Sequence, residues 1–143
     1  GTPAGVAVVI GNGDVNSSNG RAGGNSSHAV VVKYDGSATL SGDLALVSDA
    51  RLKSNIISLG NTLAKLMQID GKSYTMKSNE RESKIGLLAQ DVAKVLPELV
   101  KKSDDSDGTL SVNYQGLIPV LINAIKEQQK EIKAIRNRIN GKG

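Results

Sequence analysis

Isoleucine recurs at every seventh position in the last part of this 143-residue sequence. The series is Ile118, Ile125, Ile132 and Ile139, and Ile122 and Gln129 fill the intermediate positions at alternating spacings of four and three. This heptad pattern predicts a coiled-coil helix over about residues 116–140, because it lines one narrow stripe of the helix with apolar side chains. Isoleucine at both core positions favours three or more strands. We therefore expect a homotrimer whose seam contains Ile118, Ile122, Ile125, Ile132 and Ile139. Packing of the same helix inside one chain is the alternative.

The composition changes abruptly near residue 48. The first 42 residues are rich in Gly, Ser and Asn, contain short β-branched runs at 6–10 and 29–33, and show no helical periodicity. Turn dipeptides stand at 12–13, 19–20, 35–36 and 41–42. Strands this short could hardly fold alone. We interpret residues 1–47 as the end of a β-rich, multi-chain fibre, with a flexible linker as the alternative.

Residues 48–143 have the pattern of a small α+β domain. In order, the expected elements are a helix over 54–67, a strand over 72–76 in which Tyr74 could be buried, a helix over 85–95 that ends before Pro97, a hairpin with strands at 99–102 and 109–114, and the coiled-coil helix. The hairpin loop is acidic.

The charge of the chain argues against several partners. The net charge is +4, and residues 126–143 alone hold six basic and two acidic residues. Basic residues there complement a helix C-terminus, and no aromatic residue interleaves with them for base stacking, so we expect no nucleic-acid partner. No run approaches ~20 apolar residues and no signal peptide opens the sequence, so we expect no membrane partner.

Metal and cofactor motifs fail on inspection. The chain has no cysteine and a single histidine, His28. Ser103–Gly108 resembles the start of a calcium loop, but Tyr114 stands where a bidentate Glu is needed. A phosphate-binding loop ending at Gly71-Lys72-Ser73 would need Gly at position 66, which is leucine. We expect neither a metal nor a cofactor.

One short stretch contains the candidate catalytic residues. The sequence Ser48-Asp-Ala-Arg-Leu-Lys53-Ser-Asn55-Ile56, taken alone, indicates an N-cap before a helical turn. Two further blocks follow in order: Gly86–Val92 with Leu96–Val100, and Ser111–Tyr114 with Leu117–Ile125. Together they closely resemble the intramolecular chaperone and auto-processing domain, peptidase family S74, found at the C-termini of phage endosialidases and tail fibres. The resemblance covers Ser48 to about Arg136.

The resemblance implies a homotrimeric domain that helps an upstream β-rich fibre to fold and then releases itself by autoproteolysis. By the same resemblance Ser48 is the nucleophile, Lys53 is the general base, and the cleavage site lies between Val47 and Ser48. The chain would thus be a self-cleaving serine endopeptidase with a Ser-Lys dyad, acting once, in cis or within the trimer. A lysine accepts a proton only when it is neutral, so we expect Lys53 to be desolvated. Asn55, Gln90 or backbone amides are candidates for orienting or oxyanion groups.

Regular secondary structure cannot join this dyad. Five positions turn a helix by ~500°, which leaves the two side chains roughly 140° apart, and in a strand they would face opposite sides. The chain must therefore turn between Ser48 and Lys53, or the lysine must come from a neighbouring subunit.

The prediction as a whole is an α+β chain in two parts. Residues 1–47 are the Gly-rich β end of a trimeric tail fibre or tailspike, and residues 48–143 are the chaperone domain with its long trimeric coiled-coil helix. We expect a virion protein used in host attachment, made in the bacterial host cytoplasm, whose upstream fibre is the folding client and whose chaperone domain is released on maturation. The alternative is a structural trimerisation tip in which Ser48 only caps a helix and never cuts.

Overall fold

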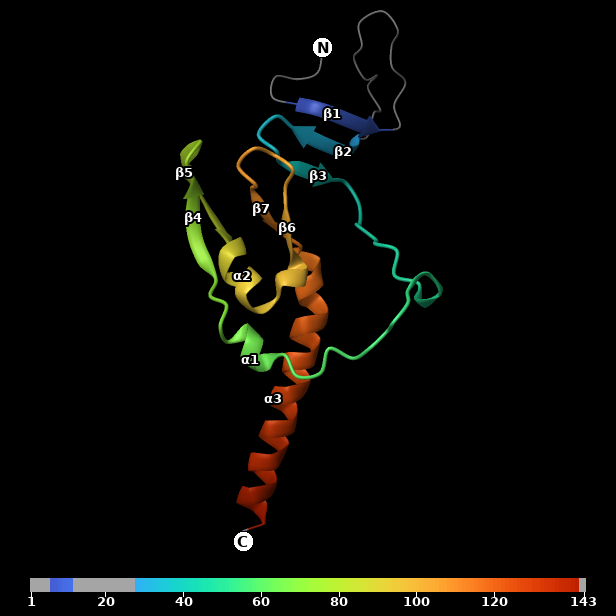
Figure 1. Cartoon of the computed structure of the whole chain (residues 1–143), viewed down its shortest axis with the longest axis vertical. Coiled ribbons are helices and arrows are strands. Elements are labelled where there is room, and N and C mark those ends of the chain that lie inside the picture. The colour runs from blue at the N-terminus through green and yellow to red at the C-terminus, as the bar shows by residue number, and fades with distance from the viewer. Residues whose placement is uncertain (1–5, 12–27, 142–143) are drawn as a thin grey trace, which may run out of the picture. The chain divides into compact units, whose positions relative to one another are not determined.

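The computed structural model describes residues 6–11 and 28–141 of the chain. The chain divides into two compact units, 1–55 and 56–143, and their elements are labelled in Figure 1. The predicted functional boundary between Val47 and Ser48 falls inside the first unit and remains a prediction. No helix in the described part of the chain is long and apolar enough to cross a lipid bilayer.

An antiparallel sheet is the main element of the first unit. Its strands lie in the order β1 (Val6–Gly11), β2 (His28–Lys33) and β3 (Ala38–Leu40). The β-branched runs near 6–10 and 29–33 are therefore strands, as predicted. Between β2 and β3, Gly36 adopts a φ of 83°, which glycine reaches at little cost, and the Ser37 N–H donates to the Asp35 carboxylate at 2.9 Å. The turns expected at 12–13 and 19–20 lie outside the described residues.

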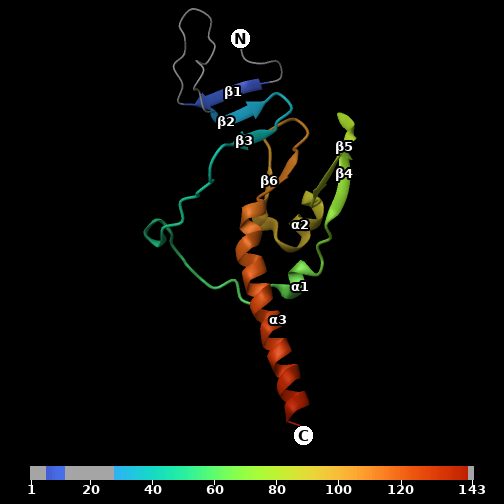
Figure 2. The ribbon, with the colours of Figure 1, turned by 180° about the vertical axis from the view of Figure 1, so that it is seen from behind.

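The second unit mixes helices with β-hairpins, which confirms the α+β class. Its elements are α1 (Leu63–Leu66), β4 (Lys72–Met76), β5 (Asn79–Gly86), α2 (Ala89–Val95), β6 (Val100–Lys102), β7 (Leu110–Val112) and α3 (Leu117–Asn140). β4 pairs with β5 and β6 pairs with β7, both antiparallel. Both ribbon views show the second half of α3 extending beyond the rest of this unit (Figures 1 and 2).

The core of the second unit joins α2 to α3. Val92 is fully buried, Leu96 is 6% exposed, and Val120 and Ala124 are each 3% exposed. Leu66, Ile69, Leu87, Leu99, Val100 and Val112 are among the partly buried side chains that pack around this group. The core is small and aliphatic, as the scarcity of aromatic residues requires.

The helix predicted over 54–67 is mostly absent. Only Leu63–Leu66 is helical, and residues 54–61 are exposed. Two backbone conformations prevent an earlier start, because Asn55 has a φ of 52° and Gly60 a φ of 65°, both outside the helical region. The apolar spacing at Ile56 and Leu59 therefore does not mark a buried helix face.

The helix predicted over 85–95 begins four residues late. Ile85 and Gly86 end strand β5, where Gly86 pairs with Lys72, so the sequence prediction missed this hairpin strand. A Cβ on Gly86 would lie only 2.7 Å from the Tyr114 hydroxyl oxygen, so the close approach of a tyrosine keeps this position free of a side chain. Tyr74, considered as a buried residue, is 37% exposed.

The last two predicted elements agree with the structure. The acidic-loop hairpin is present as β6 and β7, with slightly shorter strands than expected. The long helix, predicted over about 116–140, is α3 (Leu117–Asn140). Successive residues turn about 100° around a helix, so the seam stripe lies on the opposite face from buried Val120 and Ala124.

Candidate functional site

A single 3-10 turn shapes the Ser48–Lys53 segment. Asp49 caps this turn, Ala50–Leu52, and accepts a hydrogen bond from the Arg51 N–H at 2.8 Å. The Leu52 N–H donates to the Asp49 carbonyl at 3.1 Å, and the Lys53 N–H donates to the Ala50 carbonyl at 3.1 Å. Short Asp and Ala side chains suit such a turn, because Asp can satisfy the free N–H groups at its start. The cap in this segment is thus Asp49.

The turn brings the two predicted catalytic side chains together. The Lys53 Nζ donates to the Ser48 Oγ at 2.7 Å. Of the two routes to a dyad, a turn within one chain is therefore sufficient for contact, and no second subunit is needed for it. Their catalytic roles stay a prediction at this point.

The expected desolvation of Lys53 is absent in the single chain. Ser48 and Lys53 are both exposed, and so is Val47, at 83%. The turn lies on a segment whose residues are mostly exposed in the single chain, and desolvation of Lys53 in an assembled site stays a prediction. Exposure of Val47 leaves the adjoining peptide bond accessible.

An ion pair stiffens the same turn. The Arg51 guanidinium contacts the Asp49 carboxylate through Nη2 at 2.6 Å and through Nε at 3.0 and 3.1 Å. The side-chain hydrogen bonds from Arg51, followed by its backbone N–H, lower the pKa of Asp49 from its ordinary value. The same pairing raises the pKa of Arg51. Asp49 therefore stays ionised as the cap.

The two expected orienting residues lie in different units. Asn55 is exposed and takes the left-handed conformation, with φ 52°, that ends the first unit. Gln90 is an exposed residue of α2 in the second unit. Neither assignment is tested by these positions, and both stay predictions.

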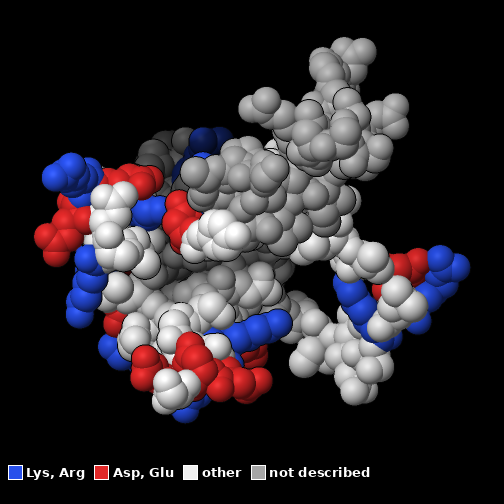
Figure 3. All heavy atoms as spheres, turned by 90° about the horizontal axis from the view of Figure 1, so that it is seen from above, with Lys and Arg blue, Asp and Glu red and all other residues white. Residues whose placement is uncertain are grey.

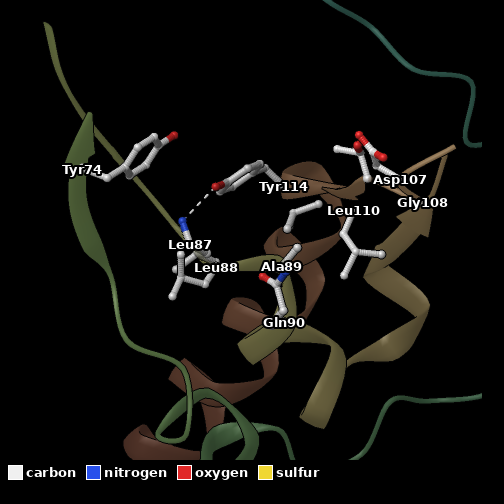
Figure 4. A pocket seen from close by; sticks show the side chains of 11 residues that line it. Tyr74, Leu87, Leu88, Ala89, Gln90, Asp107, Gly108, Leu110 and Tyr114 are labelled. Atoms are coloured by element: carbon white, nitrogen blue, oxygen red, sulfur yellow. Dashed lines mark hydrogen bonds between the residues drawn. The ribbon is translucent and has the colours of Figure 1, made fainter. Parts of the chain in front are cut away.

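The second unit contains a cavity that the sequence did not reveal. Its volume is about 470 Å³, and it is open to solvent between the hairpins and the start of α2. Figure 4 shows Tyr74, Tyr114, Gln90 and Leu110 around it, with the Tyr114 hydroxyl accepting a hydrogen bond from the Leu87 N–H at 2.8 Å. These residues lie up to 40 positions apart on several elements, so no local motif could have indicated the cavity.

Charged side chains are mixed in sign across the surface that Figure 3 presents. Lys and Arg lie next to Asp and Glu, and several form surface pairs such as Lys94 with Asp91 at 2.9 Å. Within the described residues, no group of three or more His, Cys, Asp or Glu side chains is arranged to hold a metal ion.

Comparison with known proteins assigns the segment that contains the turn. Residues 48–101 match the family model described as chaperone of endosialidase, which also carries the name peptidase S74. The match begins at Ser48, the residue that Lys53 contacts. Over these residues the chain is similar to the chaperone-of-endosialidase family. The resemblance inferred from the sequence is therefore confirmed over residues 48–101.

Tail-fibre proteins are among the relatives of this chain. It is 34% identical over 105 residues to the long tail fiber protein Gp37 of Escherichia phage AR1, covering 68% of this chain and 10% of that protein. The Gp37 of Salmonella phage S16 is 34% identical over 117 residues, covering 75% and 15%. The Gp37 of Enterobacteria phage Ox2 is 35% identical over 101 residues, covering 66% and 40%. The chain thus spans two fifths or less of the length of these relatives.

Proposed function

We propose that this chain is the chaperone end of a phage tail fibre or tailspike, and that it trimerises, assists folding of the fibre, and then releases itself by cutting the Val47–Ser48 bond. The observation that carries the proposal is the 2.7 Å contact between Lys53 Nζ and Ser48 Oγ, at the first residue of the chaperone-of-endosialidase match. The tail-fibre context rests on the Gp37 relatives.

The proposed reaction is an acyl transfer at the Val47 carbonyl. Ser48 Oγ attacks this carbon while a neutral Lys53 takes the hydroxyl proton. The C–N bond then breaks, Lys53 returns the proton to the amine of Ser48, and an ester joins Val47 to the serine oxygen. Water hydrolyses the ester, which leaves a carboxylate on Val47 and a free hydroxyl and amine on Ser48. One water is consumed, and no cofactor takes part.

Assembly would cover apolar side chains that are exposed in the single chain. The five seam isoleucines are between 47% and 69% exposed, and an apolar stripe of this length on a charged helix calls for partner helices. Large apolar residues are also exposed around the turn: Leu44, Leu46, Val47, Leu52, Ile56 and Ile57. We propose that two further copies cover these side chains around a threefold axis. Covering Leu52 and Ile56 would also remove water from around Lys53.

This order of events suits a chaperone. Pairing of strands from several chains is slow and exposes strand edges meanwhile. Joining the chain ends through α3 first lowers the entropic cost of aligning the upstream fibre. Cutting only after assembly prevents early loss of the chaperone. The cut fibre would remain in the virion for host attachment, and its chaperone domain would leave.

Intact-mass measurement after folding tests the cleavage. The expected C-terminal product begins at Ser48 and contains residues 48–143. Ser48→Ala removes the nucleophile and Lys53→Ala removes the base, so both should abolish cutting without preventing assembly. Lys53→Arg should fail as well, because a guanidinium stays protonated. Cutting that persists in Ser48→Ala would show that Ser48 is not the nucleophile, and the dyad assignment would be wrong.

Deletion of residues 48–143 tests the chaperone role separately. The upstream fibre, expressed without this domain, should be misfolded or insoluble. Addition of Ser48→Ala to the full fibre is the matched control, because it keeps the domain but should block release. Soluble, native-like fibre made without the domain would contradict a chaperone role.

The exposure of Lys53 favours one alternative, a structural trimerisation tip. In that case the Asp49-capped turn is only a connector, and Ser48 has no chemistry. Denaturing electrophoresis of freshly folded protein distinguishes the two functions: two fragments indicate the protease, and one intact band indicates the structural tip.

A further inference from the structure

A short segment after the dyad turn is tied to one face of α3. The Thr62 Oγ1 donates to the Val120 carbonyl at 2.7 Å, and Thr62 is only 2% exposed. The Thr62 and Leu63 N–H groups both donate to the same oxygen of Glu127, Leu63 at 3.0 Å. The Asn123 amide donates to the Gly60 carbonyl at 2.9 Å. We call residues 60–63 with these α3 side chains the clamp.

A short connection joins the dyad turn to the clamp. Only six residues, 54–59, separate Lys53 from Gly60, and every residue from Arg51 to Asn61 is exposed. Each residue of extended chain spans at most about 3.5 Å. The place where residues 60–63 are held therefore limits where the Ser48–Lys53 turn can lie relative to other copies of the chain.

Glu127 is the last residue of α3 that the rest of its own chain partly buries. It is partly buried, whereas every residue from Gln128 to Gly141 is exposed. A helix without tertiary packing is marginal in water and frays from its end. Ile125 and Ile132 flank Glu127 in the sequence and are 62% and 49% exposed on the opposite face. Burial of these isoleucines by partner helices would keep α3 helical through Glu127.

We propose that Glu127 is a positioning residue that links assembly of α3 to self-cleavage, an inference that rests on the proposed function. Seam formation holds the helix around Glu127, and the Glu127 carboxylate then holds the two N–H groups at the start of α1. The segment that follows the dyad turn is fixed as a result. The single chain can form both the helix and the clamp, but without partner helices the exposed end of α3 opens more often than in the trimer, and the clamp then holds the segment after the turn less firmly.

Three variants of the full chain separate positioning from general stability. Glu127→Ala removes the acceptor and should slow cutting roughly 10-fold at equal trimer content, since small misplacements of reacting groups cost this much or more. Glu127→Gln keeps one oxygen that can accept from both N–H groups, so it should cut within about twofold of the wild-type rate. The control is Glu131→Ala, an exposed glutamate one turn further along α3, which should leave the rate unchanged. Wild-type cutting by Glu127→Ala trimers would overturn the proposal.

Amide hydrogen exchange gives a readout that does not depend on cutting. In a Ser48→Ala background, the Thr62 and Leu63 amides should be protected in the trimer. They should lose protection in Glu127→Ala and in the seam variant Ile125→Asp with Ile132→Asp. Protection that survives in the unassembled seam variant would show that the clamp does not depend on assembly, and the inference would fail.

A second pair of variants covers the case in which Glu127→Ala does not fold. Thr62→Val removes the hydroxyl donor to the Val120 carbonyl at nearly constant shape, and Thr62→Ser restores it. Slow cutting by the first and recovery by the second would support the clamp, and equal rates would contradict it. A wild-type chain that never cuts would refute the proposed function, while the exchange experiment would still decide whether the clamp responds to assembly.

Discussion

The dyad turn and the clamp are held in opposite ways. The contacts of the turn join residues at most five positions apart, and the side chains of Ser48 and Lys53 are exposed. The contacts of the clamp join residues 58 to 65 positions apart and bury Thr62. A local turn can thus bring Ser48 and Lys53 together without contacts to distant residues. In the proposed function, the burial that would make Lys53 an effective base comes from assembly and not from this local turn.

The largest expected effect tests whether the exposed turn depends on assembly. Ile125→Asp with Ile132→Asp should prevent trimer formation, because each seam position would bury an unpaired charge. Cutting should disappear with it. Light scattering measures the first effect and intact mass the second.

The matched control for the seam variant is Lys130→Asp on the same helix. Lys130 is exposed and lies off the seam stripe, so its substitution should leave both assembly and cutting intact. A seam variant that remains trimeric would show that the stripe is misassigned. A monomeric variant that still cuts would show that cutting does not depend on assembly.

A smaller effect should separate the core from the turn. Val92→Ala removes two methyl groups from a fully buried site and should lower the free energy of unfolding by roughly 2 kcal/mol. Thermal denaturation measures this loss. Below the transition the chain stays folded, so the contacts of the turn and of the clamp persist and the cutting rate should be unchanged. Ile85→Ala, at an 87% exposed position, should barely alter stability.

Removal of the cap should have a more modest effect on the turn. Asp49→Ala leaves the Arg51 N–H without its acceptor, and we expect cutting to slow a few-fold as the turn opens more often. Arg51→Ala should slow cutting by less than about twofold, because an ion pair this exposed contributes little. Single-turnover rates by mass spectrometry compare them. If Arg51→Ala were the slower variant, the ion pair would be the main support of the turn.

The smallest effect concerns pH. Because Arg51 lowers the pKa of Asp49 below its ordinary value of 3.8, the stabilisation of the cap is complete above pH 3.8 and is lost as the pH falls through the lower folded value. NMR titration of the Asp49 carboxyl in a Ser48→Ala chain should show the depressed pKa. Arg51→Ala should return it toward 3.8. A carboxyl that titrates normally in the intact chain would mean that the ion pair does not form.

Local patterns succeeded where neighbours along the chain decide the structure. Strand β4 and helix α3 follow from turn residues and periodicity, and their observed bounds agree with the predicted ones within about a residue. Helix and strand geometry left two routes to the Ser48–Lys53 contact, a turn or a lysine from a neighbouring subunit, and the single chain contains the turn. Periodicity misled at residues 54–62, where apolar residues have helical spacing but Asn55 and Gly60 adopt positive φ values that lie outside the helical region.

The sequence by itself determined the α+β class, the long heptad helix, the chaperone-of-endosialidase match and the residues proposed for the dyad. Each of these is encoded in spacing or in a contiguous motif. Only the tertiary structure decided that Lys53 is exposed in one chain, that α1 begins at Leu63, and that Glu127 holds its start. Glu127 and Thr62 lie 65 positions apart, and a bond of that range depends on how α3 packs. No local pattern records such packing.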